Sequence, residues 1–143
     1  MSLVKVSYTI SMGHRLPSYV GICRSPHGHN IKVEAECNAA GFLDFKSISK
    51  WLETILKPLD HAMVLHRTDP IVDVYKQDDR FKDFRYVLLS VEPTTEALAQ
   101  LVMNELSSYC HVTFVTVHET DKYSATCIGV SSDVYRVPPG ESK

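Results

Sequence analysis

The chain has 143 residues, of which 44% are hydrophobic and 22% charged, and these values indicate one globular domain that can bury a core without disulfides. Its formal net charge of −2 leaves no basic surplus to neutralise phosphates, which argues against nucleic acid as the main partner. No apolar run approaches the roughly 20 residues of a membrane helix, and residues 1–5 are too mixed for a signal peptide, so we expect a cytoplasmic protein. The four cysteines form no CxxC pair, and we expect them to be reduced thiols.

Two strands are predicted first. Residues 4–12 alternate apolar and polar side chains, and residues 31–38 do the same. This period of two is typical of a strand with one buried face. Residues 17–26, between the two runs, are rich in turn-forming residues and are read as a loop.

Two helices follow in the prediction. Asp44 can cap the first, and Pro58 ends it, with apolar residues at helical spacing between them: Phe45, Ile48, Trp51, Leu52, Ile55 and Leu56. Residues 66–85 are highly charged and are read as an exposed excursion, followed by a short strand within residues 85–92. The second helix begins at Pro93-Thr94-Thr95-Glu96 and carries an apolar stripe at Leu98, Leu101, Val102, Leu106 and Tyr109.

Two further β-rich runs, residues 112–119 and 123–130, complete the pattern. Apart from the excursion, the order is β-β-α-α-β-β. This order predicts an α+β fold, a four-stranded antiparallel sheet with two helices packed on one face. We expect a single domain over residues 1–143, with residues 138–143 as a flexible tail.

The sharpest local pattern is His27-Gly28-His29. Side chains two apart in a strand point to the same face, and these histidines continue the buried face that follows at Ile31. His14 continues the buried face of the first strand, so antiparallel pairing would bring it to the other two. Three neutral imidazoles with an open fourth position describe a catalytic zinc site. The alternative is a set of surface histidines in a loop. His66, His111 and His118 show no such pattern and are interpreted as structural or surface groups.

Cys23 lies in a polar loop, four residues before His27. The neighbouring Arg24 and a nearby cation favour a thiolate, and a thiolate beside a metal can act as a general base. Two alternatives remain open, a loop cysteine without a role and a fourth zinc ligand.

Three more residues are candidates for the same site. Asp60 and His61 follow the first helix, where they form either a proton relay or a solvated pair at the helix end. Glu119 ends a strand run on its buried face, where a carboxylate needs a partner. A ligand with a guanidine-like edge would satisfy it bidentately, and the alternative is a salt bridge to a lysine such as Lys122.

Over residues 4–130, the chain resembles the 6-pyruvoyltetrahydropterin synthase family, with its motifs in the same order. The motifs are His14, Cys23-x-x-x-His27-Gly28-His29-Asn30, Gly41-x-x-Asp44-Phe45, Leu59-Asp60-His61, Pro93-Thr94-Thr95-Glu96 and His118-Glu119-Thr120. The resemblance implies the tunnelling fold (T-fold) and homohexamers of two stacked trimers, with active sites at subunit interfaces. It also implies a zinc-dependent lyase that acts on 7,8-dihydroneopterin triphosphate and needs no redox cofactor.

The resemblance also implies a role for each matching residue. The roles are zinc ligands at His14, His27 and His29; proton transfer at Cys23, Asp60 and His61; and pterin binding at Glu119, Thr94 and Thr95. Zinc would hold the hydroxyls of the substrate side chain while protons move. The contacts to the triphosphate are not identified by any motif, although Arg15 and Arg24 lie close to the site in sequence.

The carboxy branch of the family, 6-carboxytetrahydropterin synthase of queuosine biosynthesis, is the better match. Cys23 precedes His27 by four residues, as in that branch, whereas the spacing in the animal pyruvoyl branch is longer by two. The chain departs from the family at Met12-Gly13, at Ile31 and in its longer excursion. Two other classes compete with the lyase, a non-catalytic T-fold module that binds pterin and structural zinc, and a metal-dependent hydrolase. The proton-transfer residues disfavour the first, and the second lacks a motif that would activate water.

Overall fold

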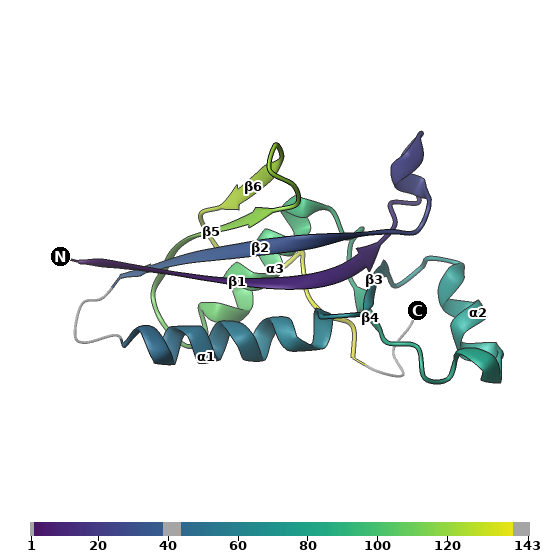
Figure 1. The fold of residues 1–143 in the computed structure, drawn as a ribbon, viewed down its shortest axis with the longest axis horizontal. Helices are drawn as coiled ribbons and strands as arrows, with labels where there is room; N and C mark the ends of the chain where they lie inside the picture. Colours follow the sequence, from purple (N-terminus) through teal and green to yellow (C-terminus); the bar gives the residue numbers. More distant parts are fainter. Residues whose placement is uncertain (1, 39–43, 139–143) are drawn as a thin grey trace.

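The computed structural model of the protein describes residues 2–38 and 44–138 (Figure 1). Its centre is a long antiparallel hairpin of β1 (Leu3–His14) and β2 (His27–Asn38). The register runs from Leu3 opposite Asn38 to His14 opposite His27. Buried and more exposed side chains alternate along most of both strands, as predicted, so the hairpin has one core face and one open face.

The sheet continues on both sides of this hairpin. β5 (Val112–His118) pairs antiparallel with β2, and β6 (Ser124–Cys127) pairs antiparallel with β5. On the other side, β3 (Met63–His66) pairs parallel with the last two residues of β1, and β4 (Tyr86–Leu89) pairs parallel with β3. The strand order is β4-β3-β1-β2-β5-β6.

The α+β class is confirmed, but the described residues form six strands and not four, and the sheet is not wholly antiparallel, since β3 pairs in parallel with β1 and β4. β4 lies where a short strand was expected. β3 was missed because four residues are too few to show an alternating pattern.

The charged excursion, residues 66–85, is a folded unit. It contains α2 (Ile71–Gln77) and a 3₁₀ turn, Asp79–Phe81. Ring contacts with centroids 4.9–5.9 Å apart join its aromatic residues to the start of β4: Tyr75, Phe81, Phe84 and Tyr86. These rings give a segment with many charges its own small apolar cluster.

The two predicted helices are confirmed as α1 (Phe45–Leu56) and α3 (Thr95–Leu106). The Asp44 carboxylate accepts from the N–H of Lys46 at 3.1 Å, and the Thr94 hydroxyl accepts from the N–H of Ala97 at 3.1 Å, so both helices begin at side-chain caps. Figure 1 shows α1 and α3 on the same side of the hairpin, where they contact β1 and β5 respectively.

The main core lies between these helices and the sheet. Val33, Leu52 and Leu101 are buried in it from β2, α1 and α3. Among residues 2–38 and 44–138, no helix is long and apolar enough to cross a bilayer. The predicted flexible tail falls outside the described residues, except for Pro138.

Candidate metal centre and active site

Three histidines meet on the core face of the hairpin, at the end where β1 stops and β2 begins. His14 lies directly opposite His27 in the register, and Met12 lies opposite His29. The three ring centroids are 4.5–5.2 Å apart, and one nitrogen from each ring lies within 4.8 Å of the others. The structure therefore brings together the three residues that strand parity predicted.

Backbone carbonyls orient two of the rings. His14 Nδ1 lies 2.8 Å from the carbonyl oxygen of Pro93, and His27 Nδ1 lies 2.7 Å from that of Ser25. Because a carbonyl only accepts, both Nδ1 atoms must donate, and the lone pair of each ring is then on Nε2. Such partners fix the tautomer of metal-binding histidines. No side-chain pattern marks a backbone carbonyl, so these two partners could not be predicted from the sequence.

The free nitrogens of this cluster fit a metal ion. The Nε2 atoms of His14 and His29 are buried without a hydrogen-bond partner, which is costly unless something fills the space between them. Burial is the largest cause that lowers the pKa of His14, and the charge of His27 lowers it further, against the hydrogen bond to Pro93. Burial thus favours the neutral form of His14, which is the form that coordinates zinc.

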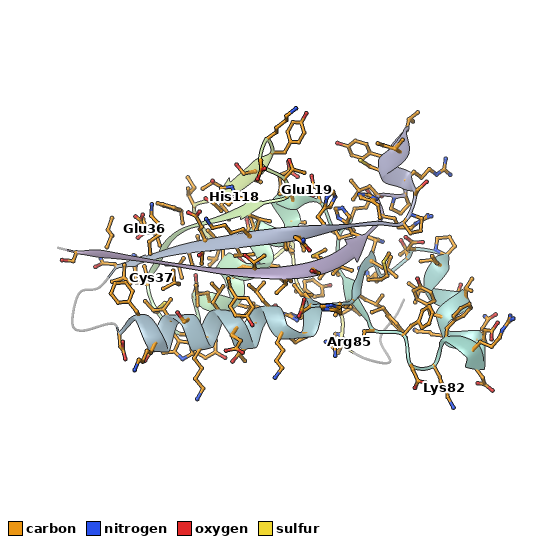
Figure 2. All side chains as sticks on the ribbon, viewed as in Figure 1. Glu36, Cys37, Lys82, Arg85, His118 and Glu119 are labelled. Atoms are coloured by element: carbon orange, nitrogen blue, oxygen red, sulfur yellow. The ribbon has the colours of Figure 1, made fainter. Side chains whose placement is uncertain are left out.

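Glu119 reaches the same cluster from the end of β5. One carboxylate oxygen, Oε1, lies 3.4 Å from His14 Nε2 and 3.3 Å from His29 Nε2, and the side chain is 23% exposed. Its ion-pair contacts among the described residues are with these histidines and not with Lys122. Figure 2 shows Glu119 and its neighbour His118 at this end of β5. A ligand held over the histidines would therefore meet this carboxylate.

The start of α3 supports the metal centre. Pro93, whose carbonyl holds His14, immediately precedes the helix cap Thr94. The Thr94 hydroxyl is used in capping, and Thr95 is the first residue of the helix. Glu92 accepts from both the N–H and the hydroxyl of Ser18, at 2.8 and 2.5 Å, and so fastens the loop after β1 to the same segment.

Cys23 lies in that loop, in a 3₁₀ turn, Ile22–Arg24, that projects past the end of the sheet (Figure 1). Its thiol is free and half-buried. Its carbonyl accepts from the N–H of Leu16, a buried residue that anchors the base of the loop. Arg15, considered for triphosphate contact, is engaged instead with the buried Asp69, at 2.7 Å between Nε and Oδ2.

Asp60 and His61 contact each other at the edge of β1. Asp60 Oδ1 accepts from the N–H of Ser11 at 2.9 Å and lies 3.1 Å from His61 Nδ1. The hydrogen bond from Ser11 and then the one from His61 lower the pKa of Asp60. His61 has a φ of 57°, unlike every other non-glycine residue in the described segments, and its side chain is 76% exposed. Residues with a strained backbone are frequent at functional sites, and here such a residue carries an exposed imidazole.

A cavity of about 570 Å³ joins these two groups of residues. Its lining includes His27 and His29 from the metal centre and His61 from the turn after α1. The open face of the hairpin therefore connects the proposed proton-transfer histidine to the edge of the histidine cluster.

Comparison with known proteins gives the family of this chain. The family model of 6-pyruvoyl tetrahydropterin synthase matches residues 3–129. A probable 6-carboxy-5,6,7,8-tetrahydropterin synthase from Halobacterium salinarum is 30% identical over 121 residues, which are 81% of this chain and 79% of the relative.

Two solved structures share the fold. An uncharacterized protein from Wolinella succinogenes has a TM-score of 0.71 and 18% identity, with 90% of this chain and 99% of the other covered. The 6-pyruvoyl tetrahydropterin synthase of Caenorhabditis elegans has a TM-score of 0.61 and 22% identity, with 90% and 97% covered. The chain has the T-fold and belongs to the 6-pyruvoyl tetrahydropterin synthase family.

Proposed function

We propose that this protein is a zinc-dependent 6-carboxy-5,6,7,8-tetrahydropterin synthase. It would convert 7,8-dihydroneopterin triphosphate and one water molecule to 6-carboxytetrahydropterin, acetaldehyde and triphosphate. The observation that carries the proposal is the cluster of His14, His27 and His29, in which two buried Nε2 atoms have no hydrogen-bond partner. The name of the Halobacterium relative supports the choice of branch.

His14, His27 and His29 would hold the metal. Three nitrogen ligands and an open position suit Zn²⁺, which when bound polarises the side-chain hydroxyls of the substrate and makes the neighbouring C–H protons more acidic. The carbonyls of Pro93 and Ser25 keep two of these rings in the ligand tautomer.

Cys23 and His61 would move the protons. The Cys23 thiolate takes a proton from carbon, and His61 Nε2 exchanges a second one, while Asp60 accepts from His61 Nδ1 and holds the ring in place. His61 is 76% exposed, so its ring is open to a substrate. The homohexamer of two stacked trimers, with active sites at subunit interfaces, and the cytoplasmic location remain predictions.

Glu119 would bind the pterin ring. Its carboxylate can accept two parallel N–H bonds from the 2-amino-pyrimidinone edge, and it already lies 3.3 Å from a metal-site nitrogen. Thr94 and Thr95 would line the pocket. Because the Thr94 hydroxyl caps α3, we expect its contact with the ring to be made by the methyl group.

The second candidate is 6-pyruvoyltetrahydropterin synthase, in which only triphosphate is eliminated. The family model carries the name of this enzyme. The four-residue step from Cys23 to His27 favours the carboxy product. A zinc-containing module that binds pterin without turnover is disfavoured by the 3.1 Å contact between Asp60 and His61, since a binder needs no proton relay.

The test is to incubate the zinc-loaded protein with 7,8-dihydroneopterin triphosphate and identify the products by mass. 6-Carboxytetrahydropterin with acetaldehyde supports the proposal, and a pyruvoyl product moves the protein to the sister branch. If the substrate is not consumed, the enzyme assignment fails.

A Cys23→Ala variant separates catalysis from metal binding. It should lose turnover by at least about 100-fold, the usual contribution of a general base, with its zinc content unchanged. Loss of zinc together with turnover would instead make Cys23 a ligand. Cys127→Ala, a thiol that lies on β6, is the matched control.

A further inference from the structure

The segment between His61 and α3 folds back onto His61. β3 and β4 pair in parallel with Met63 opposite Tyr86, and the carbonyl of Arg85 accepts from the N–H of Met63 at 3.0 Å. The three residues before β4 therefore return to the turn that carries His61. A cavity of about 410 Å³ lies there, and its lining includes His61, Asp83, Phe84 and Arg85.

This second cavity continues the first. Gly13, His61 and Met63 line both, so the two cavities adjoin and form one groove from the edge of the histidine cluster, past His61, to Arg85. A substrate group that extends past His61, away from the histidine cluster, would enter this second cavity.

The side chain at the far end of the groove is Arg85, a cation with unused hydrogen-bond donors. Arg85 Nη2 donates to the carbonyl of Lys57 at 3.2 Å, which uses one of the five guanidinium N–H groups and holds the side chain in place. Arg85 has no carboxylate within ion-pair distance among the described residues, yet its charge reaches Asp60 and helps to lower the pKa of that carboxyl. Phe84 beside it is 51% exposed.

We propose that Arg85 binds the triphosphate group of the substrate at this end of the groove, beyond His61. The inference rests on the proposed function, because that function supplies a triphosphate ester to the His61 imidazole. A guanidinium can contact two phosphate oxygens at once. Asp83 lines the same cavity, and its carboxylate opposes the anion, which keeps binding weak enough for the triphosphate to leave as a product.

The probe is inorganic triphosphate, titrated by calorimetry into the full-length zinc-loaded protein. Arg85→Gln should weaken binding by about tenfold or more, the loss expected for a hydrogen-bonded charge, and Arg85→Lys should restore part of it. Asp83→Asn should tighten binding several-fold. Lys82→Gln makes the same charge change three residues away and should leave the affinity within about twofold, since Figure 2 shows Lys82 extending outward, well separated from Arg85.

Equal affinities of wild type, Arg85→Gln and Lys82→Gln would overturn the proposal, provided that melting temperature and zinc content show Arg85→Gln to be folded. With 7,8-dihydroneopterin triphosphate, Arg85→Gln should raise KM with little change in kcat. If no protein turns the substrate over but triphosphate binding depends on Arg85, the proposed function fails and the anion site stands. If turnover occurs and Arg85→Gln behaves as Lys82→Gln, the function stands and the anion site fails.

Discussion

The two ends of the β1–β2 hairpin have the same strand parity and the same core face, yet they serve different purposes. At one end Val4 faces Cys37, and the Cys37 thiol lies 3.5 Å from that of Cys110 among apolar neighbours. At the other end His14 faces His27, so imidazole rings stand on the face that carries apolar side chains along the rest of the hairpin. The apolar side chains at one end are packed against each other. At the histidine end, buried ring nitrogens have no hydrogen-bond partner. A functional site can thus be recognised as the part of a core that its own chain does not complete.

Removing one ligand should break the histidine end. His27→Ala, at a half-buried position, should lower zinc affinity by more than about 100-fold, since even a lost supporting partner costs 10–100-fold. Competition with a chromophoric chelator measures this. His118→Ala is the control, because His118 contacts Glu34 instead, at 3.2 Å. Wild-type affinity in His27→Ala would contradict the assigned ligand set.

Removing a buried side chain should weaken the apolar part of the same strand. Ile31 is 2% exposed, so Ile31→Ala should lower the free energy of unfolding by about 2–5 kcal/mol. Urea unfolding of the metal-free protein measures the change. Lys32→Ala, on the open face, should change it by less than about 0.5 kcal/mol. Similar losses in both variants would mean that the two faces of β2 are not distinct.

The cap of α3 lies next to the histidine end of the hairpin. The cap residue, Thr94, directly follows Pro93, whose carbonyl orients the His14 ring. Thr94→Ala should lower the free energy of unfolding by about 1 kcal/mol through the lost bond to the N–H of Ala97. Thr95→Ala, inside the helix, is the matched control and should have a smaller effect. Equal melting temperatures for the two variants would show that the capping bond contributes little.

A pH effect is expected at the apolar end of the hairpin. Burial, with the neighbouring Cys110 thiol, raises the pKa of Cys37 to about 12, while an unfolded thiol ionises near pH 9. Above pH 9 the unfolded chain therefore loses this proton first, so stability should fall as pH rises toward 12, by at most about 1.4 kcal/mol per pH unit. Cys37→Ala should flatten this slope. Cys127→Ala should keep it, and an unchanged slope in Cys37→Ala would refute the cause.

The elements and residues that could be predicted from the sequence are those that follow a periodic pattern of side chains. Alternation placed the core face of β1 and β2, and the same alternation placed His14 with His27 and His29. Helical spacing and the Asp44 and Thr94 caps placed α1 and α3.

Features without a side-chain signal were missed. β3 is too short to alternate, and the rings that fold residues 66–85 are spread among charges. The carbonyl partners of the histidines, the left-handed backbone of His61 and the position of Arg85 beside it depend on tertiary contacts that no local pattern encodes.

All three proposed metal ligands belong to one hairpin, which has a consequence for the order of folding. Residues 15–26 alone join His14 to His27, so bringing them together closes less chain, and costs less entropy, than the contact of His14 with Pro93. Pro93, which fixes the His14 ring, is far away in sequence and must arrive with α3. We expect zinc to capture the hairpin early and weakly, and to be held tightly only when α3 docks.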